Sequence, residues 1–295
     1  MNFDWVGKSV DGATVILRKF TGDFKGASYA TPEWLAAHAD RVRIGAVIDV
    51  ETTGLNKKSD VVIEIGVRQF LFNKITGELL KAGDSYSAFQ DPGRPLSDEI
   101  KRLTGLNDEM LKGHTIDWNK VDRLLAESNI IIAHNASFDR PFIERNSTVS
   151  PTKSWGCSVK QVDWTSKGYP SQKLEILSIF HGYFVDAHRA LHDADALLHL
   201  LSHADAQSRK PYLDELLRNA RRPLVKVVAS HAPFESKDFL KERGYSWDTT
   251  GRVWHKMIFK ETLETEVAWM ESIVYNGTFR GSTVEIAIVD NFKSS

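Results

Sequence analysis

The stretch Ile44–Leu55, with the sequence IGAVIDVETTGL, most constrains the fold, because two carboxylates follow an apolar run. Such a run is typical of a buried strand, in which residues two apart point to the same face. Asp49 and Glu51 are therefore expected side by side, where burial and mutual repulsion are costly without a cation. A divalent metal ion would meet that need, because hard cations prefer carboxylate oxygens. On this stretch alone, the alternative of two strand-end carboxylates facing solvent stays open.

Composition limits the classes of protein to which the chain can belong. Its 295 residues are 42% hydrophobic, carry a formal net charge of −1 and include one cysteine, Cys157. The length suggests two domains or one large domain with attachments, and the small net charge means that any nucleic-acid-binding surface is local. One cysteine allows no internal disulfide, and the N-terminus lacks the basic and apolar regions of a secretory signal. No apolar run approaches the roughly 20 residues that span a bilayer, so we expect a soluble cytoplasmic protein.

The order of apolar runs and turns predicts three regions. Residues 1–43 form an N-terminal extension, in which Thr31 caps a short helix that begins at Pro32. Residues 44–208 form an α/β domain, in which the Asp49 strand and the strands at 61–72 and 85–90 suggest an antiparallel meander. A single apolar strand at 129–133 among helices suggests parallel additions to the same sheet. We therefore expect a mixed sheet with flanking helices, followed by a small α+β domain over residues 209–295.

Two more aspartates occupy inward positions on predicted helices. Asp139 shares a face with Phe142 and Ile143 in a helix predicted to begin at Phe138. A first-turn acid stabilised by the helix dipole is the other interpretation of Asp139. Asp193 lies on the apolar stripe of a predicted helix over 190–206, where a lone buried charge would cost several kcal/mol. A metal site shared with the carboxylates of the first strand would remove that cost.

Histidines accompany this last helix. His188 precedes Asp193 by five residues, which would put them roughly 140° apart on a continuous helix. We therefore expect His188 in the loop that enters the helix, above the same cavity. A second group of histidines and an aspartate on the same helix has the spacing of a metal site. It lies opposite the leucines, so we expect it to form a solvated polar face. Its members are His192, Asp195, His199 and His203.

Together these segments resemble the DEDDh 3′–5′ exonucleases, which include the epsilon proofreading subunit of bacterial replicases, RNase T and exonuclease X. The resemblance rests on D-x-E-T-T-G-L from Asp49, H-N-A-x-F-D ending at Asp139, and H-x4-D from His188 to Asp193. It covers about residues 43–205 and implies a ribonuclease-H-like fold. The segment Trp155–Ser158 looks closer to the exonuclease X branch.

The resemblance implies a role for each matching residue. Asp49, Glu51, Asp139 and Asp193 would hold two Mg²⁺ or Mn²⁺ ions about 3.5–4 Å apart. His188 would be the general base, because imidazole titrates near neutral pH. The terminal nucleotide would contact the loop at 52–54 and pack on apolar side chains. His134 and Asn135 would shape the loop in which they lie. The substrate-binding set implied is Thr52, Thr53, Gly54, Leu55, Leu103, His134, Asn135 and Phe138.

The C-terminal region carries a local basic excess. Residues 210–260 contain eleven Lys or Arg and six Asp or Glu. In one interpretation, this module grips the nucleic-acid backbone and an exposed aromatic side chain stacks on a base. In the other, Trp247 and Trp254 are core residues and the charges form an ordinary solvated surface. The candidate nucleic-acid contacts are Lys237, Lys241, Arg243, Arg252 and Lys256.

These observations favour a metal-dependent 3′–5′ exonuclease that releases nucleoside 5′-monophosphates, with DNA as the favoured substrate. Its expected partners are nucleic acid with a free 3′ end and a polymerase or repair complex, with no membrane. Two alternatives stay open: an RNA-trimming exoribonuclease, and an adaptor in which the C-terminal binding module is primary. The inward Asp193 argues against the adaptor, which would have no need of it.

Overall fold

The computed structural model describes residues 7–8, 14–22, 24, 30–185 and 189–293. The chain divides into two units, Met1–Ala220 with Phe292–Ser295, and Arg221–Asn291. Each unit has a hydrophobic core of its own. No helix among the described residues is long and apolar enough to cross a bilayer.

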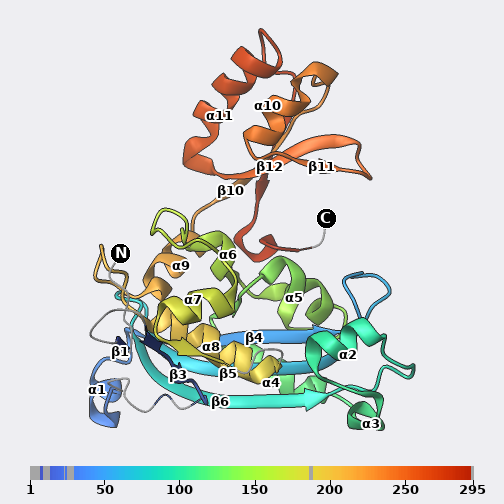
Figure 1. The fold of residues 1–295 in the computed structure, drawn as a ribbon. Helices are drawn as coiled ribbons and strands as arrows, with labels where there is room; N and C mark the ends of the chain where they lie inside the picture. Colours follow the sequence, from blue (N-terminus) through green and yellow to red (C-terminus); the bar gives the residue numbers. More distant parts are fainter. Residues whose placement is uncertain (1–6, 9–13, 23, 25–29, 186–188, 294–295) are drawn as a thin grey trace. The chain divides into compact units, whose positions relative to one another are not determined.

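The first unit is built on a five-stranded mixed sheet with the strand order β6-β5-β4-β7-β8 (Figure 1). Its strands are β4 (Val42–Thr52), β5 (Val62–Asn73), β6 (Leu79–Phe89), β7 (Ile130–Ala133) and β8 (Trp155–Cys157). β4, β5 and β6 pair antiparallel, whereas β7 and β8 add in parallel on the other side of β4. This arrangement confirms the predicted α/β fold. β6 begins earlier than the predicted 85–90, because Leu79 and Leu80 continue the buried strand.

Helices cover both faces of this sheet, because alternate residues of β4 point to opposite sides. On one face, Val47 shares a core with α7 (Leu174–Phe180), α8 (Ala190–Ser202) and α9 (Tyr212–Ala220). On the other face, Ile48 shares a core with α4 (Trp118–Glu127) and α5 (Ala136–Glu144). Asp49 and Glu51 therefore lie on the face that α8 covers.

Short elements complete the first unit. They are β1 (Gly7–Lys8), β2 (Val15–Ile16), β3 (Arg18–Lys19), α1 (Pro32–Ala37), α2 (Asp98–Thr104), α3 (Asp108–Leu111), η1 (Ser150–Thr152), α6 (Ser158–Gln161) and β9 (Tyr183–Phe184). The Thr31 hydroxyl caps α1 as predicted, by accepting from the Trp34 N–H. The N-terminal segment packs onto the main domain, because Phe24 is part of the α8 core.

The boundary between the units differs from the predicted residue 208. Helix α9 follows that point, yet its buried residues Tyr212, Leu213 and Leu216 belong to the core of the first unit. The amphipathic pattern of α9 shows that one face is buried but does not identify the core that buries it. The second unit therefore begins at Arg221.

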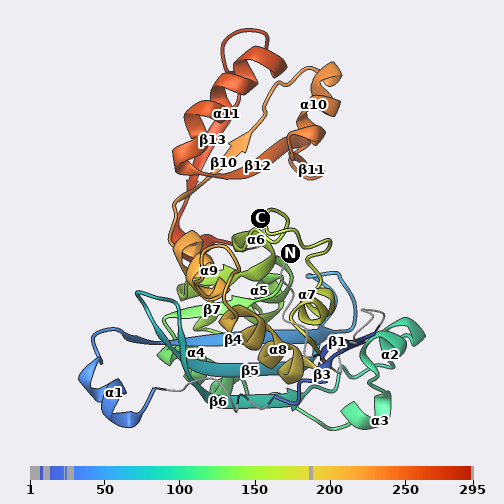
Figure 2. The same cartoon turned by 60° about the vertical axis from the view of Figure 1, so that its left-hand side comes forward.

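The second unit is a four-stranded antiparallel sheet with helices on one face (Figure 2). Its strands, in the order β11-β12-β10-β13, are β10 (Leu224–Val228), β11 (Ser246–Asp248), β12 (Val253–Phe259) and β13 (Ser282–Ile286). Its helical elements are η2 (Phe234–Ser236), α10 (Lys237–Glu242), η3 (Lys260–Thr262), α11 (Leu263–Trp269), the π turn η4 (Met270–Val274) and η5 (Ile288–Asp290). In α10, Leu240 is buried, whereas its neighbour Phe239 is 52% exposed.

Candidate active site

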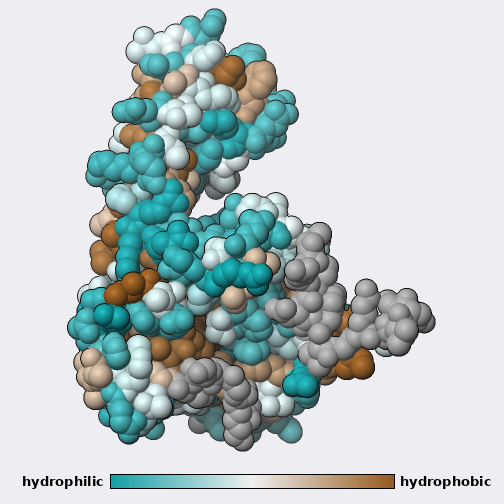
Figure 3. All heavy atoms as spheres, turned by 90° about the vertical axis from the view of Figure 1, so that its left-hand side faces the viewer, coloured by the Kyte–Doolittle hydropathy of each residue, from teal (hydrophilic) through white to brown (hydrophobic). Residues whose placement is uncertain are grey.

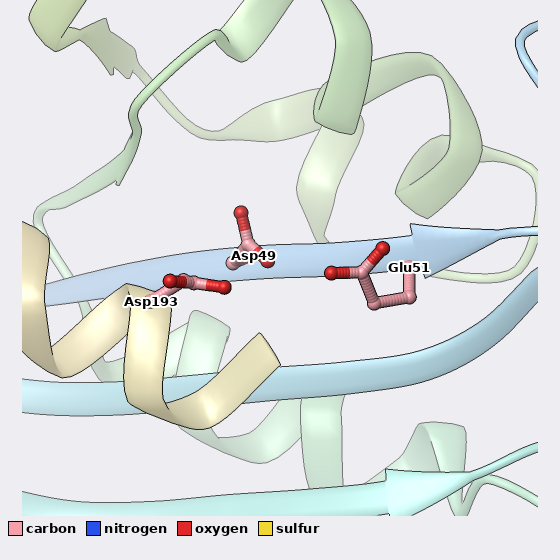
Figure 4. A group of neighbouring side chains, drawn as sticks. All are labelled: Asp49, Glu51 and Asp193. Atoms are coloured by element: carbon pink, nitrogen blue, oxygen red, sulfur yellow. The ribbon is translucent and has the colours of Figure 1, made fainter. Parts of the chain in front are cut away.

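Three carboxylates converge where β4 meets the start of α8. Asp49 and Glu51 project from β4, and Asp193 projects from the first turn of α8 (Figure 4). One oxygen from each of the three lies within 4.8 Å of the others. All three side chains are half-buried. Hard carboxylate oxygens this close together fit a divalent cation.

A glycine allows α8 to approach the sheet closely enough to form this group. Gly66 of β5 lies directly opposite Asp49 in the strand pair. A Cβ atom on Gly66 would lie 2.2 Å from the backbone nitrogen of Leu191 and 2.3 Å from the carbonyl carbon of Ala190. The first turn of α8 therefore rests on the bare backbone of β5. The Asp193 carboxylate also accepts from the Arg189 N–H at 3.2 Å, which stabilises the start of its own helix.

The electrostatics of the group favour a bound cation. Burial raises the pKa of Asp49 well above its usual range, and the charges of Asp139, Asp193 and Glu51 raise it further. Burial also raises the pKa of Glu51 to about 8, with contributions from the charges of Asp193 and Glu64. Without a cation, these carboxylates are therefore held partly protonated near neutral pH.

Asp139, the fourth predicted carboxylate, is buried at the start of α5. Its pKa is raised to about 7 by burial, and the backbone of Val50 hydrogen-bonds it. It lies outside the group of three, although its charge has the largest effect of any neighbouring charge on the pKa of Asp49. Helix α5 begins at Ala136, two residues before the predicted start at Phe138, so Pro141 lies inside the helix rather than in its first turn. The predicted general base, His188, lies outside the described residues.

The loop after β4 is held by its own hydroxyls. The Thr52 hydroxyl donates to the Gly54 carbonyl at 2.6 Å, and the Thr53 hydroxyl donates to Asp60 at 2.9 Å. Leu55 then projects into solvent with 81% of its surface exposed, and Leu103 at the end of α2 is 50% exposed. Two exposed leucines gain no stability from burial, so they are available to an apolar part of a ligand.

The H-N-A-x-F-D segment forms the turn between β7 and α5. His134 Nε2 hydrogen-bonds the carbonyl of Gln172 at 2.8 Å, and burial lowers the His134 pKa to about 4. A neutral His134 therefore donates from Nε2 and ties this turn to the loop before α7. Asn135 is the N-cap of α5 but makes no side-chain cap bond, and Phe138 packs against Phe142.

The second polar group of α8, which contains Asp195 and His199, does not form the solvated face that the helical wheel predicted. Asp195 is 2% exposed and forms a two-point ion pair with Arg68, at 2.7 and 2.9 Å. His199 stacks on Phe20 at 4.6 Å between ring centres, and burial lowers its pKa to about 3. The expectation fails because the N-terminal segment and β5 both contact α8 outside the leucine stripe. Of these predicted members, His192 is exposed.

Two charged residues beside the site were absent from the sequence-based predictions. Glu64 of β5 lies directly opposite Glu51 and is buried, and Arg189 forms an ion pair with it at 3.3 Å. The signal for Glu64 was present in the sequence, because VVIEIG places a carboxylate inside an apolar run, as the Asp49 stretch does.

In the second unit, two of the five predicted nucleic-acid contacts serve an internal ion cluster. Arg243 and Lys256 bind the buried carboxylate of Glu266 at 3.1 and 3.3 Å. Lys241 lies 4.0 Å from Asp238, and the Lys237 ammonium lies over the ring of Phe234. Arg252 occupies a turn with a positive φ of 50°. Trp247 is 47% exposed beside Trp254, which packs against the core of this unit.

A family model supplies the comparison that assigns the first unit. The model of the RNase_T family, described as an exonuclease, matches residues 46–201, more than half of the chain. This chain belongs to the RNase_T exonuclease family. It is a member of the DEDDh type, and the matched residues extend from β4 to the end of α8.

Similar proteins agree with this RNase_T assignment. A DNA polymerase III PolC-type of Listeria innocua is 35% identical over 166 residues, covering 52% of this chain and 11% of the relative. The PolC-type polymerase of Bacillus subtilis is 32% identical over 185 residues, covering 59% of this chain and 12% of the relative. The chain thus spans little more than a tenth of the length of these relatives.

A solved structure shares the RNase_T fold. The zinc-bound form of the Escherichia coli exonuclease I complex with single-stranded DNA superposes with a TM-score of 0.51. Its sequence is 15% identical, and the match covers 74% of this chain and 63% of that one.

Proposed function

We propose that this chain is a metal-dependent 3′–5′ exonuclease that hydrolyses nucleic acid from its 3′ end and releases nucleoside 5′-monophosphates. The observation that carries the proposal is the convergence of Asp49, Glu51 and Asp193 within 4.8 Å at the junction of β4 and α8. A family with exonuclease activity supports the reaction class. We also propose a cytoplasmic location for this activity.

The family implies a divalent metal, and we propose two ions, Mg²⁺ or Mn²⁺, held by Asp49, Glu51, Asp139 and Asp193. When bound, such ions lower the pKa of a water and stabilise the charge that develops on the phosphate. Asp49 and Glu51 offer oxygens from one strand face, and Asp193 offers one from the helix above it. We assign His188 the role of general base, because imidazole titrates near neutral pH and His188 lies two residues before α8 in the sequence.

The 3′-terminal nucleotide would lie on the loop after β4. Leu55 and Leu103 are exposed apolar side chains that would pack against its base. Backbone of Thr52–Gly54 would contact its sugar, since the hydroxyls of Thr52 and Thr53 are engaged in holding the loop. Phe138 would pack on the same base, while His134 and Asn135 shape the turn beside it.

DNA is the proposed substrate, because the curated relatives are named as DNA polymerases. The same name supports a polymerase or repair complex as the proposed setting. The RNA-trimming alternative rests on the fact that the motifs of a 3′-end site do not distinguish ribose from deoxyribose.

For the second unit, we propose that the candidate nucleic-acid contacts are reduced to Lys237, Lys241 and Arg252. Arg243 and Lys256 hold Glu266 and so stabilise the unit itself. Phe234 supports the proposal, because it is 77% exposed beside the Lys237 ammonium and offers a ring to a base. On the face that Figure 3 shows, hydrophilic side chains of this unit are interspersed with hydrophobic ones.

One assay tests the reaction and the substrate together. Single-stranded DNA, duplex DNA and RNA labelled at the 5′ end are incubated in parallel with Mg²⁺, Mn²⁺ or EDTA. We expect a ladder that shortens from the 3′ end on DNA with metal and intact DNA in EDTA. Faster degradation of RNA would establish the exoribonuclease alternative, and no degradation of any substrate would leave the adaptor alternative standing.

A further inference from the structure

Glu64 is a buried carboxylate near the start of β5 that lies outside the three exonuclease motifs. It is 1% exposed and is flanked by the buried residues Ile63 and Ile65. Replacing a buried ion pair by apolar residues is often neutral or stabilising, so stability alone does not explain a glutamate at this position. Its place in the sheet suggests another role, because it lies directly opposite Glu51.

Glu64 binds the start of α8 from the neighbouring strand. Its Oε1 atom lies 3.3 Å from the Arg189 Nε atom, and the backbone N–H of Ala190 hydrogen-bonds its carboxylate. The Arg189 guanidinium also lies 5.0 Å from the centre of the Phe89 ring. Phe89 is the β6 residue directly opposite Glu64, so Arg189 contacts two paired residues of adjacent strands. Glu64 and Phe89 thereby hold Arg189, the residue that precedes α8.

The start of α8 needs such partners. The first N–H groups of a helix have no acceptor within the helix, and the side chain of the N-cap residue Arg189 makes no cap bond. Glu64 accepts from Ala190 instead, and the Asp193 carboxylate accepts from Arg189. Asp193 follows Ala190 by three residues, so any movement of this turn moves the Asp193 oxygens relative to Asp49 and Glu51.

We propose that Glu64 is a positioning residue that holds the first turn of α8 so that Asp193 completes the metal site with Asp49 and Glu51. The proposal rests on the metal site of the proposed function. It assigns Glu64 no contact with the reacting atoms. It also explains why Gly66, two residues along the same strand, leaves room for that turn.

The test measures Mn²⁺ binding to the full chain without nucleic acid, by the loss of the free-ion EPR signal. Glu64→Ala removes both contacts, and Glu64→Gln keeps an acceptor for Ala190 but loses the charge that pairs with Arg189. We expect the Mn²⁺ dissociation constant to rise about 10- to 100-fold for Glu64→Ala, and less for Glu64→Gln. In the metal-free protein, amide exchange at residues 190–193 should quicken in the same order.

The matched control is Asp195→Asn, which weakens another buried link between β5 and α8, the ion pair with Arg68. We expect it to lower the unfolding temperature while its Mn²⁺ affinity stays within about threefold of wild type. Equal losses of Mn²⁺ affinity in Asp195→Asn and Glu64→Ala would overturn the positioning role, as would unchanged affinity or unchanged exchange in Glu64→Ala. Failure of the wild-type chain to bind Mn²⁺ would instead overturn the proposed function, and the positioning role with it.

Discussion

Asp49 and Gly66 face each other across the β4–β5 pair, and the backbone of α8 rests on the glycine beside the aspartate. Gly66→Ala should therefore displace the first turn of α8, because the added methyl would lie 2.2 Å from the Leu191 nitrogen. A misplacement of about 1 Å at a catalytic site can cost about 100-fold in rate. We expect a loss of that order in nuclease activity, with weaker Mn²⁺ binding.

Gly156→Ala in β8 is the control for this substitution. Its methyl would meet the end of the Leu216 side chain at 2.7 Å, and a side-chain end can rotate away. It should lower the unfolding temperature with little change in Mn²⁺ affinity. Normal activity of Gly66→Ala would show that α8 does not need its close approach to β5.

Asp49→Asn should separate stability from activity. The amide replaces a carboxyl whose ionised form is disfavoured, first by burial and then by the charges of Asp139, Asp193 and Glu51, which together raise the pKa of Asp49. In EDTA at pH 8, we expect the unfolding temperature to rise by about 2–4 °C, the change that corresponds to about 1 kcal/mol. Hydrolysis of a 3′-labelled oligonucleotide should be abolished. Near-normal hydrolysis, or a lower unfolding temperature in EDTA, would contradict the assigned role of Asp49.

The metal-free protein should lose stability as pH rises. The pKa of Glu51 is about 8 in the folded chain, above its usual value of 4.5, so between these two pH values the folded state binds more protons than the unfolded state. The contribution of Glu51 to the free energy of unfolding is then fully present below about pH 4.5 and is lost as pH rises through 8. Thermal unfolding in EDTA from pH 6 to 9 would measure this fall. Saturating Mn²⁺ should reduce it, and Glu51→Gln should reduce it in EDTA.

Leu55→Ala and Leu103→Ala should weaken substrate binding without weakening the fold. Both side chains are exposed, so their truncation removes little buried surface. We expect KM for single-stranded DNA to rise by about tenfold, equivalent to about 1.4 kcal/mol, with an unchanged unfolding temperature. Ile75→Ala, which truncates a 59% exposed residue in the β5–β6 turn, is the control. Equal KM values for all three variants and wild type would exclude a role for the two leucines.

Glu266→Ala should destabilise the second unit, because the buried carboxylate binds both Arg243 and Lys256. Charge-assisted hydrogen bonds of this kind contribute about 2 kcal/mol. Hydrogen exchange over residues 221–291 would report the loss, with Glu264→Ala, an exposed residue on the same helix, as the control. Unchanged exchange would show that the cluster contributes nothing to stability.

Local periodicity was enough to predict the sheet and the faces of its key carboxylates. Two-residue alternation put Asp49 and Glu51 on one side of β4, and the helical wheel put Asp193 on the buried side of α8. Both patterns depend on nearest-neighbour geometry, which a single sequence contains. The fold class followed from the order of strands and helices.

Partners that are distant in sequence could not be predicted in this way. Asp195 was expected in solvent, because the helical wheel of α8 shows a single apolar stripe. In the structure, Arg68 and Phe20 come from other segments of the chain and cover further sides of this helix. The same reason applies to α9, whose apolar face has a clear period but whose neighbours are set by the tertiary fold. Glu64 and Arg189 also meet only after β5 and α8 pack together.

The carboxylate group joins the first strand of the family domain to its last helix. A cation bound to Asp49 and Asp193 would therefore act as a crosslink that closes a loop containing almost every element of that domain. Since such an ion binds only the folded chain, it would stabilise the chain by about 2.7 kcal/mol at a hundredfold excess over its dissociation constant. A nascent chain that lacks α8 would have no such site, so nuclease activity would begin only after the whole domain had been synthesised and folded.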